Sequence, residues 1–435
     1  MATSPSPTDS SVDVEKVSYE IFSILESKFL FGYDDNKLFL SGSSTTTPAK
    51  TPSRPAFCPG KIRILSIDAV SDCLLAAASL ARLESSLRRL SGNRASRISD
   101  YFDVAAGSGA GGVLAALLFA RGPDGRSLFS AEDALSFLIK SGLPRDFAVG
   151  RKGLFQRFFR RDGGGTFRRV FGGATLRDTV KPLLIPCFDL STSAPFLFSR
   201  ADAVEADAYN FQVKDVCAAT CAGREAVQVS SVDGRTRFAA VGGEMAMANP
   251  TAAAITHVLH NKQEFPSASR VDDLLVLSIG SVHPDHFVCR SSPSKVEGVR
   301  IAGKAMAEMV DQAIAMAFGQ RSVTNYVRIQ PNDLASKALA SNVVNRDAER
   351  MLSMAEAMMI DRSLESVLFE GKRLSKETNG EKLERMAGEL IREQERRSKS
   401  PLPTVVVKQA MTPRTSSATT STATTTSTGR TFGSP

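Results

Sequence analysis

The chain has 435 residues, with 42% hydrophobic and 23% charged residues, which are values of a globular protein with a sizeable core. Its best apolar run, residues 113–120, is shorter than the roughly 18 residues that a membrane-spanning helix needs. The amino terminus lacks the basic and apolar regions of a secretory signal, and the six cysteines form no CxxC pair. These features predict a cytoplasmic protein with reduced cysteines rather than a disulfide-rich secreted domain.

The first 56 residues combine a Ser/Pro/Thr-rich start, an amphipathic helical pattern from Asp13 to about Leu30 and a polar linker. From Lys61 onward, strand and helix patterns alternate at a spacing typical of a parallel sheet covered on both faces. We expect strands over residues 62–68, 102–106, 226–231, 237–241, 274–279 and 326–329. We expect helices over residues 74–90, 113–120, 251–261, 301–318, 348–360, 363–369 and 380–397. Residues 401–435 form a Ser/Thr-rich tail that we expect to be disordered.

A glycine-rich turn follows the strand at Asp103, where the sequence reads Asp103-Val-Ala-Ala-Gly107-Ser-Gly-Ala-Gly111-Gly112. One interpretation is the nucleophile elbow G-x-S-x-G, which presents a serine at the top of a sheet. The other is the dinucleotide loop G-x-G-x-x-G, matched by Gly107, Gly109 and Gly112. A dinucleotide site also needs a strand ending in an acid about 20 residues later. The chain instead continues into a turn, so a nucleotide-binding protein stays an alternative with less support.

Further segments in sequence order narrow the choice. They are Ser66-Ile-Asp68, Asp215-Val-Cys-Ala-Ala-Thr220, Gly242-Gly243 and Asn249-Pro250-Thr251. Together with the glycine turn, they resemble the patatin-like lipid acyl hydrolases. Residues 249–262, 315–319, 325–330 and 378–381 resemble the plant class III branch of the patatin-related phospholipases A, which carry G-x-G-x-G. The resemblance implies a patatin-type α/β fold with a mostly parallel sheet over residues 57–330, and a helical C-terminal extension over residues 331–400.

The resemblance also implies a site. Patatin-like enzymes cleave acyl esters of phospholipids and galactolipids with a Ser–Asp dyad and no cofactor, and backbone amides form the oxyanion hole. The nucleophile position falls on Gly109, and the acid position falls on Val241 or Gly242, so neither member of the dyad is present. The flanking glycines Gly107, Gly111 and Gly112 are retained. The oxyanion loop corresponds to a segment without glycine, namely Ala69, Val70 and Ser71.

Two further sequence features resemble parts of a hydrolase site. Ser108 is a hydroxyl one residue from the vacant position, and it is either a fallback nucleophile or the cap of the following helix. Asp233-Gly234 repeats the letters of the acid motif, but alternating residues on both sides predict a two-residue hairpin turn. Two HxxH pairs, at 257/260 and 283/286, lack the spacing of a zinc-protease helix, so we predict no metal site.

The net charge of +8 is concentrated in residues 145–171, where eight basic and two acidic residues give +6. Six phenylalanines share this stretch. Arginine beside exposed phenylalanine suits an anionic membrane surface. The candidate membrane-contact residues are Arg151, Lys152, Arg157, Phe158, Phe159, Arg160 and Arg161. The alternatives are core phenylalanines with a solvated arginine face, or an acidic partner; we expect no nucleic acid, because no nucleic-acid-binding motif accompanies the stretch.

The sequence therefore predicts a patatin-like member of lipid metabolism whose dyad and oxyanion loop are degenerate. We expect it to be inactive or very weak as a hydrolase and to act by binding membrane phospholipids or galactolipids, in the cytoplasm with peripheral membrane contact. An atypical but active lipolytic acyl hydrolase, working through Ser108, is the alternative. The sequence indicates no particular protein partner.

Overall fold

The computed structural model describes residues 60–69, 73–141, 165–223, 225–280, 295–330, 348–367, 371–401 and 403–408. All of them belong to the unit formed by residues 58–435. Several predicted features lie outside the described residues: the amino-terminal helix and linker, Val70 and Ser71, residues 142–164 of the basic stretch, the second HxxH pair and the Ser/Thr tail.

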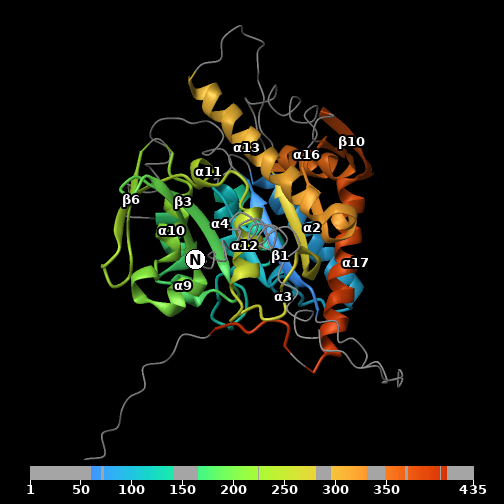
Figure 1. The fold of residues 1–435 in the computed structure, drawn as a ribbon, viewed down its shortest axis with the longest axis horizontal. Helices are drawn as coiled ribbons and strands as arrows, with labels where there is room; N and C mark the ends of the chain where they lie inside the picture. Colours follow the sequence, from blue (N-terminus) through green and yellow to red (C-terminus); the bar gives the residue numbers. More distant parts are fainter. Residues whose placement is uncertain are drawn as a thin grey trace, which may run out of the picture. The chain divides into compact units, whose positions relative to one another are not determined.

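An eight-stranded, mostly parallel sheet forms the centre of this unit (Figure 1). The strands are β1 (Ile62–Asp68), β2 (Val104–Gly107), β3 (Leu183–Asp189), β4 (Ala194–Ser199), β5 (Val227–Ser230), β6 (Arg237–Val241), β7 (Leu274–Gly280) and β8 (Tyr326–Ile329). Their order is β5-β6-β3-β2-β1-β7-β8, with β4 also paired to β3. The run β3-β2-β1-β7-β8 is parallel, whereas β4, β5 and β6 pair in antiparallel fashion. The predicted α/β fold is confirmed.

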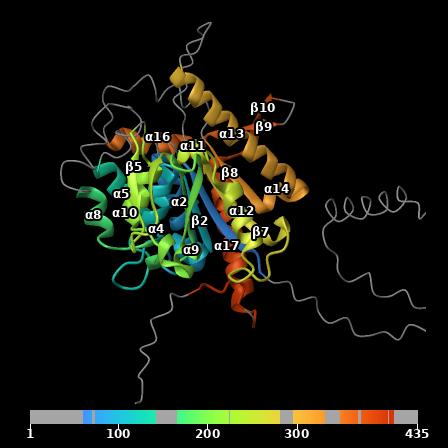
Figure 2. The same cartoon turned by 60° about the vertical axis from the view of Figure 1, so that its left-hand side comes forward.

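Helices cover both faces of the sheet, as Figure 2 shows from a second direction. They are α2 (Leu74–Ser91), α3 (Ile98–Tyr101), α4 (Ala110–Phe119), α5 (Ala131–Ser141), α8 (Gly165–Phe171), α9 (Arg200–Glu205), α10 (Val213–Thr220), α11 (Gly243–Ala246), α12 (Thr251–His260), α13 (Lys295–Phe318), α14 (Ser322–Asn325), α16 (Ala348–Ile360) and α17 (Asn379–Ser398). Within the described ranges, no helix combines the length and the apolar character needed to cross a membrane.

The core follows from the alternation of side chains along the strands. All seven residues of β1 are buried, which is typical of a central parallel strand covered on both sides. Leu65 and Ile67 belong to the larger apolar cluster with α2, α4, α10 and α17. Ile62 and Ile64 face the opposite way and join a second cluster with α12 and α13. All ten residues of α4 are buried, so this helix packs directly behind the glycine turn.

The described residues of the C-terminal extension form α16, α17 and a β-hairpin. The helix predicted over Ser363–Phe369 is wrong: Arg362–Val367 is strand β9, paired in antiparallel fashion with β10 (Gly371–Thr378). Pairing with the following strand outweighs a weak helical pattern in so short a segment. Helix α17 then begins with a capping box, in which the Thr378 hydroxyl accepts from the Glu381 amide at 3.2 Å.

A buried ion pair fixes α17 to the amino-terminal edge of the sheet. The Arg397 guanidinium donates to both carboxylate oxygens of Asp103, at 2.8 and 2.7 Å. The Arg63 amide donates to the same carboxylate at 2.8 Å. Burial alone would raise the pKa of Asp103, but Arg63 and Arg397 hold it below its usual value. Strand β2 begins at Val104, two residues later than predicted.

Candidate functional site

The glycine turn joins β2 to α4 at the carboxyl edge of the sheet. Gly109 occupies the tightest position, with φ 59° and ψ −129° at the start of α4. Positive φ is readily adopted by glycine and strained for other residues. The strand–turn–helix context and the strained central residue are those of a nucleophile elbow. Gly109 therefore lies where the attacking side chain of such an elbow would begin.

The flanking glycines allow three backbone segments to touch. A β-carbon on Gly107 would lie 2.4 Å from the Gly111 carbonyl oxygen, and one on Gly111 would lie 2.3 Å from the Ile67 carbonyl oxygen. The Gly111 amide also donates to the Ala69 carbonyl at 2.9 Å. The retained glycines are thus required for the close approach of β1, β2 and α4, whatever residue stands at position 109.

Thr220, the last residue of α10, holds the turn in place. Its buried hydroxyl accepts a hydrogen bond from the Gly109 amide at 3.0 Å. The sequence places Thr220 in a family-like segment but assigns it no role. The sequence signal for Thr220 was its position as a polar residue at the end of the apolar run Val216–Ala219. Only the fold shows that its hydroxyl contacts the Gly109 amide.

Ser108 is fully buried, and its hydroxyl has no hydrogen-bond partner among the described residues. Helix α4 has no side-chain cap, so the capping role considered for Ser108 is wrong. No described carboxylate or imidazole contacts the hydroxyl by a hydrogen bond that would activate it. The Ser108 amide donates to the Ile67 carbonyl at 3.0 Å, which fixes the backbone on the adjacent strand.

The predicted acid position lies at the end of β6, next to residues that contact the elbow. Val241 ends that strand and is buried, and Gly242 precedes α11. A β-carbon on the next residue, Gly243, would lie 2.4 Å from the Thr220 hydroxyl and 3.1 Å from the Ser108 hydroxyl. The structure therefore places Gly243, the residue after the predicted acid position, against the elbow, and neither Val241 nor Gly242 carries a carboxylate.

The other candidate acids lie elsewhere. Asp233 is in the hairpin between β5 and β6, where its carboxylate accepts from the Ser231 hydroxyl at 2.6 Å and the Arg235 amide at 3.1 Å. The hairpin is confirmed, although its loop is longer than two residues because the Ser231 amide bonds the Thr236 carbonyl. Glu244 is half-buried and reaches toward Gly303 of α13.

A buried polar network lies at the carboxyl ends of β1, β7 and β8, beside the oxyanion segment. Arg328 binds the two carboxylate oxygens of Asp68 at 2.5 and 2.6 Å and donates to the Ser278 hydroxyl at 2.6 Å. Burial opposes the charge of Arg328, but Asp68 raises its pKa above the usual value. Burial raises the pKa of Asp311, which accepts from the Tyr326 hydroxyl. The Asp68 carboxylate is therefore engaged by arginine.

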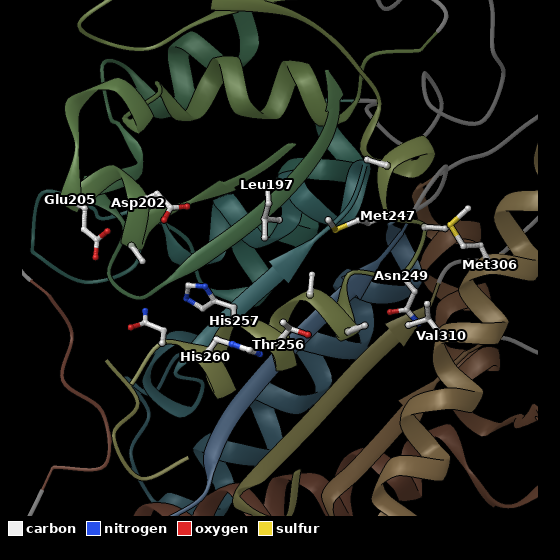
Figure 3. A pocket seen from close by; sticks show the side chains of 16 residues that line it. Leu197, Asp202, Glu205, Met247, Asn249, Thr256, His257, His260, Met306 and Val310 are labelled. Carbon is white, nitrogen blue, oxygen red and sulfur yellow. The ribbon is translucent and has the colours of Figure 1, made fainter. Parts of the chain in front are cut away.

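An open groove of about 760 Å³ lies on the α12 side of the sheet (Figure 3). Asp202 and Glu205 lie toward one end, Met306 and Val310 toward the other, and His257 between them. Other apolar lining residues are Leu197, Ala201, Met247, Ala252 and Ala253. Ala246 also lines the groove and is three residues after Gly243 in the sequence. It is large enough for a drug-sized or single-chain lipid ligand.

The groove side chains have contrasting electrostatics. Burial lowers the pKa of His257 to about 4, so the imidazole is neutral at pH 7, and its Nε2 atom has no partner among the described residues. Burial and the neighbouring Glu205 raise the pKa of Asp202. Lys408 forms an ion pair with Glu205. In the described ranges, no three metal-ligating side chains gather in one place.

The membrane-contact residues predicted between Arg151 and Arg161 lie outside the described part of the chain. At the described end of the same stretch, Phe167 and Phe171 are buried, whereas Arg168 and Arg169 are exposed. There the phenylalanines are core residues and the arginines a solvated face. The four cysteines among the described residues, Cys73, Cys187, Cys217 and Cys221, form no disulfide.

Comparison with known proteins identifies the family. No family model matches the chain. Patatin-like protein 3 of Oryza sativa subsp. indica is 50% identical over 390 residues, which cover 88% of this chain and 92% of that protein. Patatin-like protein 6 of Arabidopsis thaliana is 44% identical over 92% of this chain and 88% of its own length. Probable inactive patatin-like protein 9 of Arabidopsis thaliana is 39% identical over 87% of this chain and 93% of its own length. The chain therefore belongs to the patatin-like proteins of plants.

Proposed function

We propose that this patatin-like protein binds a membrane lipid in the groove beside α12 and does not hydrolyse it by a Ser–Asp dyad. The observation that carries the proposal is Gly109, which holds the strained elbow conformation but has only a hydrogen where a nucleophile would stand. The contact of Gly243 with the elbow supports it, because the facing acid position offers Val241 or Gly242. The name of one relative, probable inactive patatin-like protein 9 of Arabidopsis thaliana, agrees with this proposal.

The expected loss of turnover is large. Removal of the nucleophile from a serine hydrolase lowers turnover by about 10⁶. Loss of one oxyanion donor lowers it by about 10²–10³, although the two effects do not add simply. A protein with both changes would release fatty acid at a rate close to background, so a role through binding is the better explanation of a retained fold.

The groove supports a neutral lipid headgroup better than a phosphate. Carboxylates at Asp202 and Glu205 accept hydrogen bonds from sugar hydroxyls, and Asp202 disfavours a phosphate, whereas the charge of Glu205 is balanced by Lys408. The apolar remainder of the groove suits an acyl chain. Of the two lipid classes that the family resemblance implies, we therefore favour galactolipids.

The proposal is tested by measuring hydrolysis and binding separately. Purified protein is assayed for fatty-acid release from phosphatidylcholine and from monogalactosyldiacylglycerol, beside a Ser108→Ala variant. We expect background release from all samples. Release well above background that disappears in Ser108→Ala would instead establish the alternative, atypical hydrolysis through the unpartnered Ser108 hydroxyl. Tight binding of NAD in a calorimeter would favour the nucleotide alternative.

Binding in the groove is tested with a fluorescent fatty acid kept below its critical micelle concentration. Ala253 lines the groove, so Ala253→Phe would fill it and should weaken binding about tenfold or more. Ala95→Phe adds the same ring at an exposed loop position and should leave binding unchanged. Equal affinities of the two variants would contradict the groove as the site. Competition by galactolipid and by phosphatidylcholine then ranks the headgroups.

A further inference from the structure

Helix α13 presents an apolar surface to solvent. Between Ile301 and Phe318, all the solvent-exposed residues are apolar. These residues, which we call the α13 face, are Ile301, Ala302, Ala305, Met306, Met309, Ala313, Met316 and Ala317. Met309 and Met316, two helical turns apart, are 65% and 64% exposed. A helix that packs by its apolar side alone would show the reverse pattern.

The charged residues of the same segment are turned toward the body of the protein. Lys304, Glu308 and Asp311 are half-buried. Asp311 accepts from the Tyr326 hydroxyl and lies 4.0 Å from Arg328 of β8. Asp311 of α13 thus takes part in the buried network, and the exposed side of the segment is apolar. In both views the helix lies at the periphery, and its amino-terminal part extends beyond its neighbours (Figures 1 and 2).

The chemistry of this face fits hydrocarbon better than a protein partner. A typical protein–protein interface carries about one hydrogen bond per 100–200 Å². Its energetic hot spots are enriched in Trp, Tyr and Arg. The exposed side chains of the α13 face include no donor, no acceptor and no aromatic ring. In the hydrocarbon region of a bilayer every polar group is costly, so a face without polar side chains suits that environment.

The face is continuous with the groove. Met306 belongs to the α13 face and also lines the groove, where Val310 of the same helix joins it. We propose that the α13 face inserts into the hydrocarbon layer of a membrane leaflet and that an acyl chain passes over Met306 into the groove. This inference rests on the proposed lipid-binding function and specifies the surface that meets the membrane.

The experiment uses the full chain and vesicles of phosphatidylcholine, whose neutral surface isolates insertion from charge attraction. Met309→Ser with Met316→Ser removes two apolar side chains and should weaken vesicle co-sedimentation about tenfold or more. The matched control, Leu190→Ser with Val232→Ser, removes two exposed apolar side chains, 48% and 55% accessible, from the turns after β3 and β5. The control should bind as the unaltered protein does.

A direct readout comes from the absence of tryptophan in the sequence. A Met309→Trp variant carries one tryptophan on the α13 face, and its emission should shift to shorter wavelength and be quenched by brominated lipid when vesicles are added. Val232→Trp should show neither effect. No vesicle binding by the unaltered protein, equal responses of the two tryptophans, or equal binding of the two serine double variants would each overturn the inference.

The same samples separate this inference from the proposed function. Light scattering without lipid reports the oligomeric state, and a dimer that the Met309/Met316 variant dissociates would assign the face to a second copy and overturn the inference. Binding of the fluorescent fatty acid should be unchanged in that variant. If Ala253→Phe fails to weaken fatty-acid binding while the α13 face still inserts, the groove proposal fails and the membrane surface stands.

Discussion

At the scale of single residues, the elbow depends on backbone contacts more than on side chains. Gly109 adopts a conformation that costs other residues about 1–3 kcal/mol. One hydrogen bond, from its amide to the Thr220 hydroxyl, fixes it in the buried interior. The geometry of the elbow is therefore maintained by residues that a search for nucleophiles and acids does not select.

Replacement of Thr220 by valine should destabilise the protein by about 1–3 kcal/mol, because it leaves the buried Gly109 amide without an acceptor. Urea unfolding followed by circular dichroism measures the change. Thr256→Val, at an exposed position of α12, is the control and should change stability by less than about 0.5 kcal/mol. Equal stabilities of the two variants would contradict the role assigned to Thr220.

His257 makes stability depend on acidity. The pKa of His257 is about 4 in the folded protein and 6.5 for an ordinary histidine, which represents the unfolded chain. Between these two pH values the unfolded chain binds a proton that the folded chain does not. Stability is therefore independent of this group above pH 6.5 and falls as pH decreases toward 4. The urea midpoint of His257→Gln should fall less between pH 7 and pH 4.5 than that of the unaltered protein. His260→Gln, at an exposed position on the same helix, should behave like the unaltered protein.

At the scale of elements, the sheet and the C-terminal extension are joined by charge as well as by packing. Arg397 of α17 is 14% exposed and Asp103 is 1% exposed, so their pair is nearly dry. Arg392 on the same helix is 62% exposed and pairs with Glu389 at the surface. The two arginines therefore provide a comparison of buried and exposed ion pairs within one helix.

Arg397→Met should lower the free energy of unfolding by about 2–3 kcal/mol, because the buried Asp103 carboxylate loses one of the two guanidinium groups that bind it. Arg392→Met should change it by less than about 1 kcal/mol. Chemical denaturation of both variants at neutral pH gives the two values. Similar losses would show that α17 is held by its apolar contacts alone.

Elements with strong local patterns were predictable from the sequence. The buried run Ile62–Asp68 and the helices at 251–260 and 348–360 have nearly the bounds that apolar periodicity indicates. Strands β3 and β4 were missed: Pro186 interrupts the first, and the second pairs with it as an adjacent antiparallel strand at the edge of the sheet. Strand β9 was taken for a helix because its stability comes from β10, which periodicity cannot register.

The site was predictable only in part. The order of family-like segments located the elbow and the end of β6, and Gly243 after β6 lies against Ser108 of the elbow. The roles assigned to Gly109, Val241 and Gly242 stay predictions. The groove combines residues of β4, α9, α12 and α13, which are distant in the sequence, so no local pattern could indicate it. Placement in the class III branch stays a prediction. So do the roles of Val70 and Ser71, which lie outside the described residues.

At the scale of the whole molecule, the net charge of +8 should attract the chain to anionic membranes. Arg157, Arg160 and Arg161 contribute three of these charges, each worth about 1 kcal/mol near an anionic surface. Their joint replacement by glutamine should weaken co-sedimentation with phosphatidylserine vesicles at low salt and reduce its salt dependence. The Met309/Met316 serine variant should keep the salt dependence. Unchanged binding of the glutamine variant would remove the basic stretch from the membrane surface.

The packing of Gly242 and Gly243 against the elbow bears on how this lineage can change. An aspartate at Gly242 would place its β-carbon 2.5 Å from the Ala222 carbonyl oxygen, so the backbone would have to move. A serine at Gly109 would adopt a strained conformation without an acid beside it. Each of these side chains, introduced alone, would cost stability without forming a dyad. A working dyad would therefore need both substitutions together with a backbone shift at Gly242.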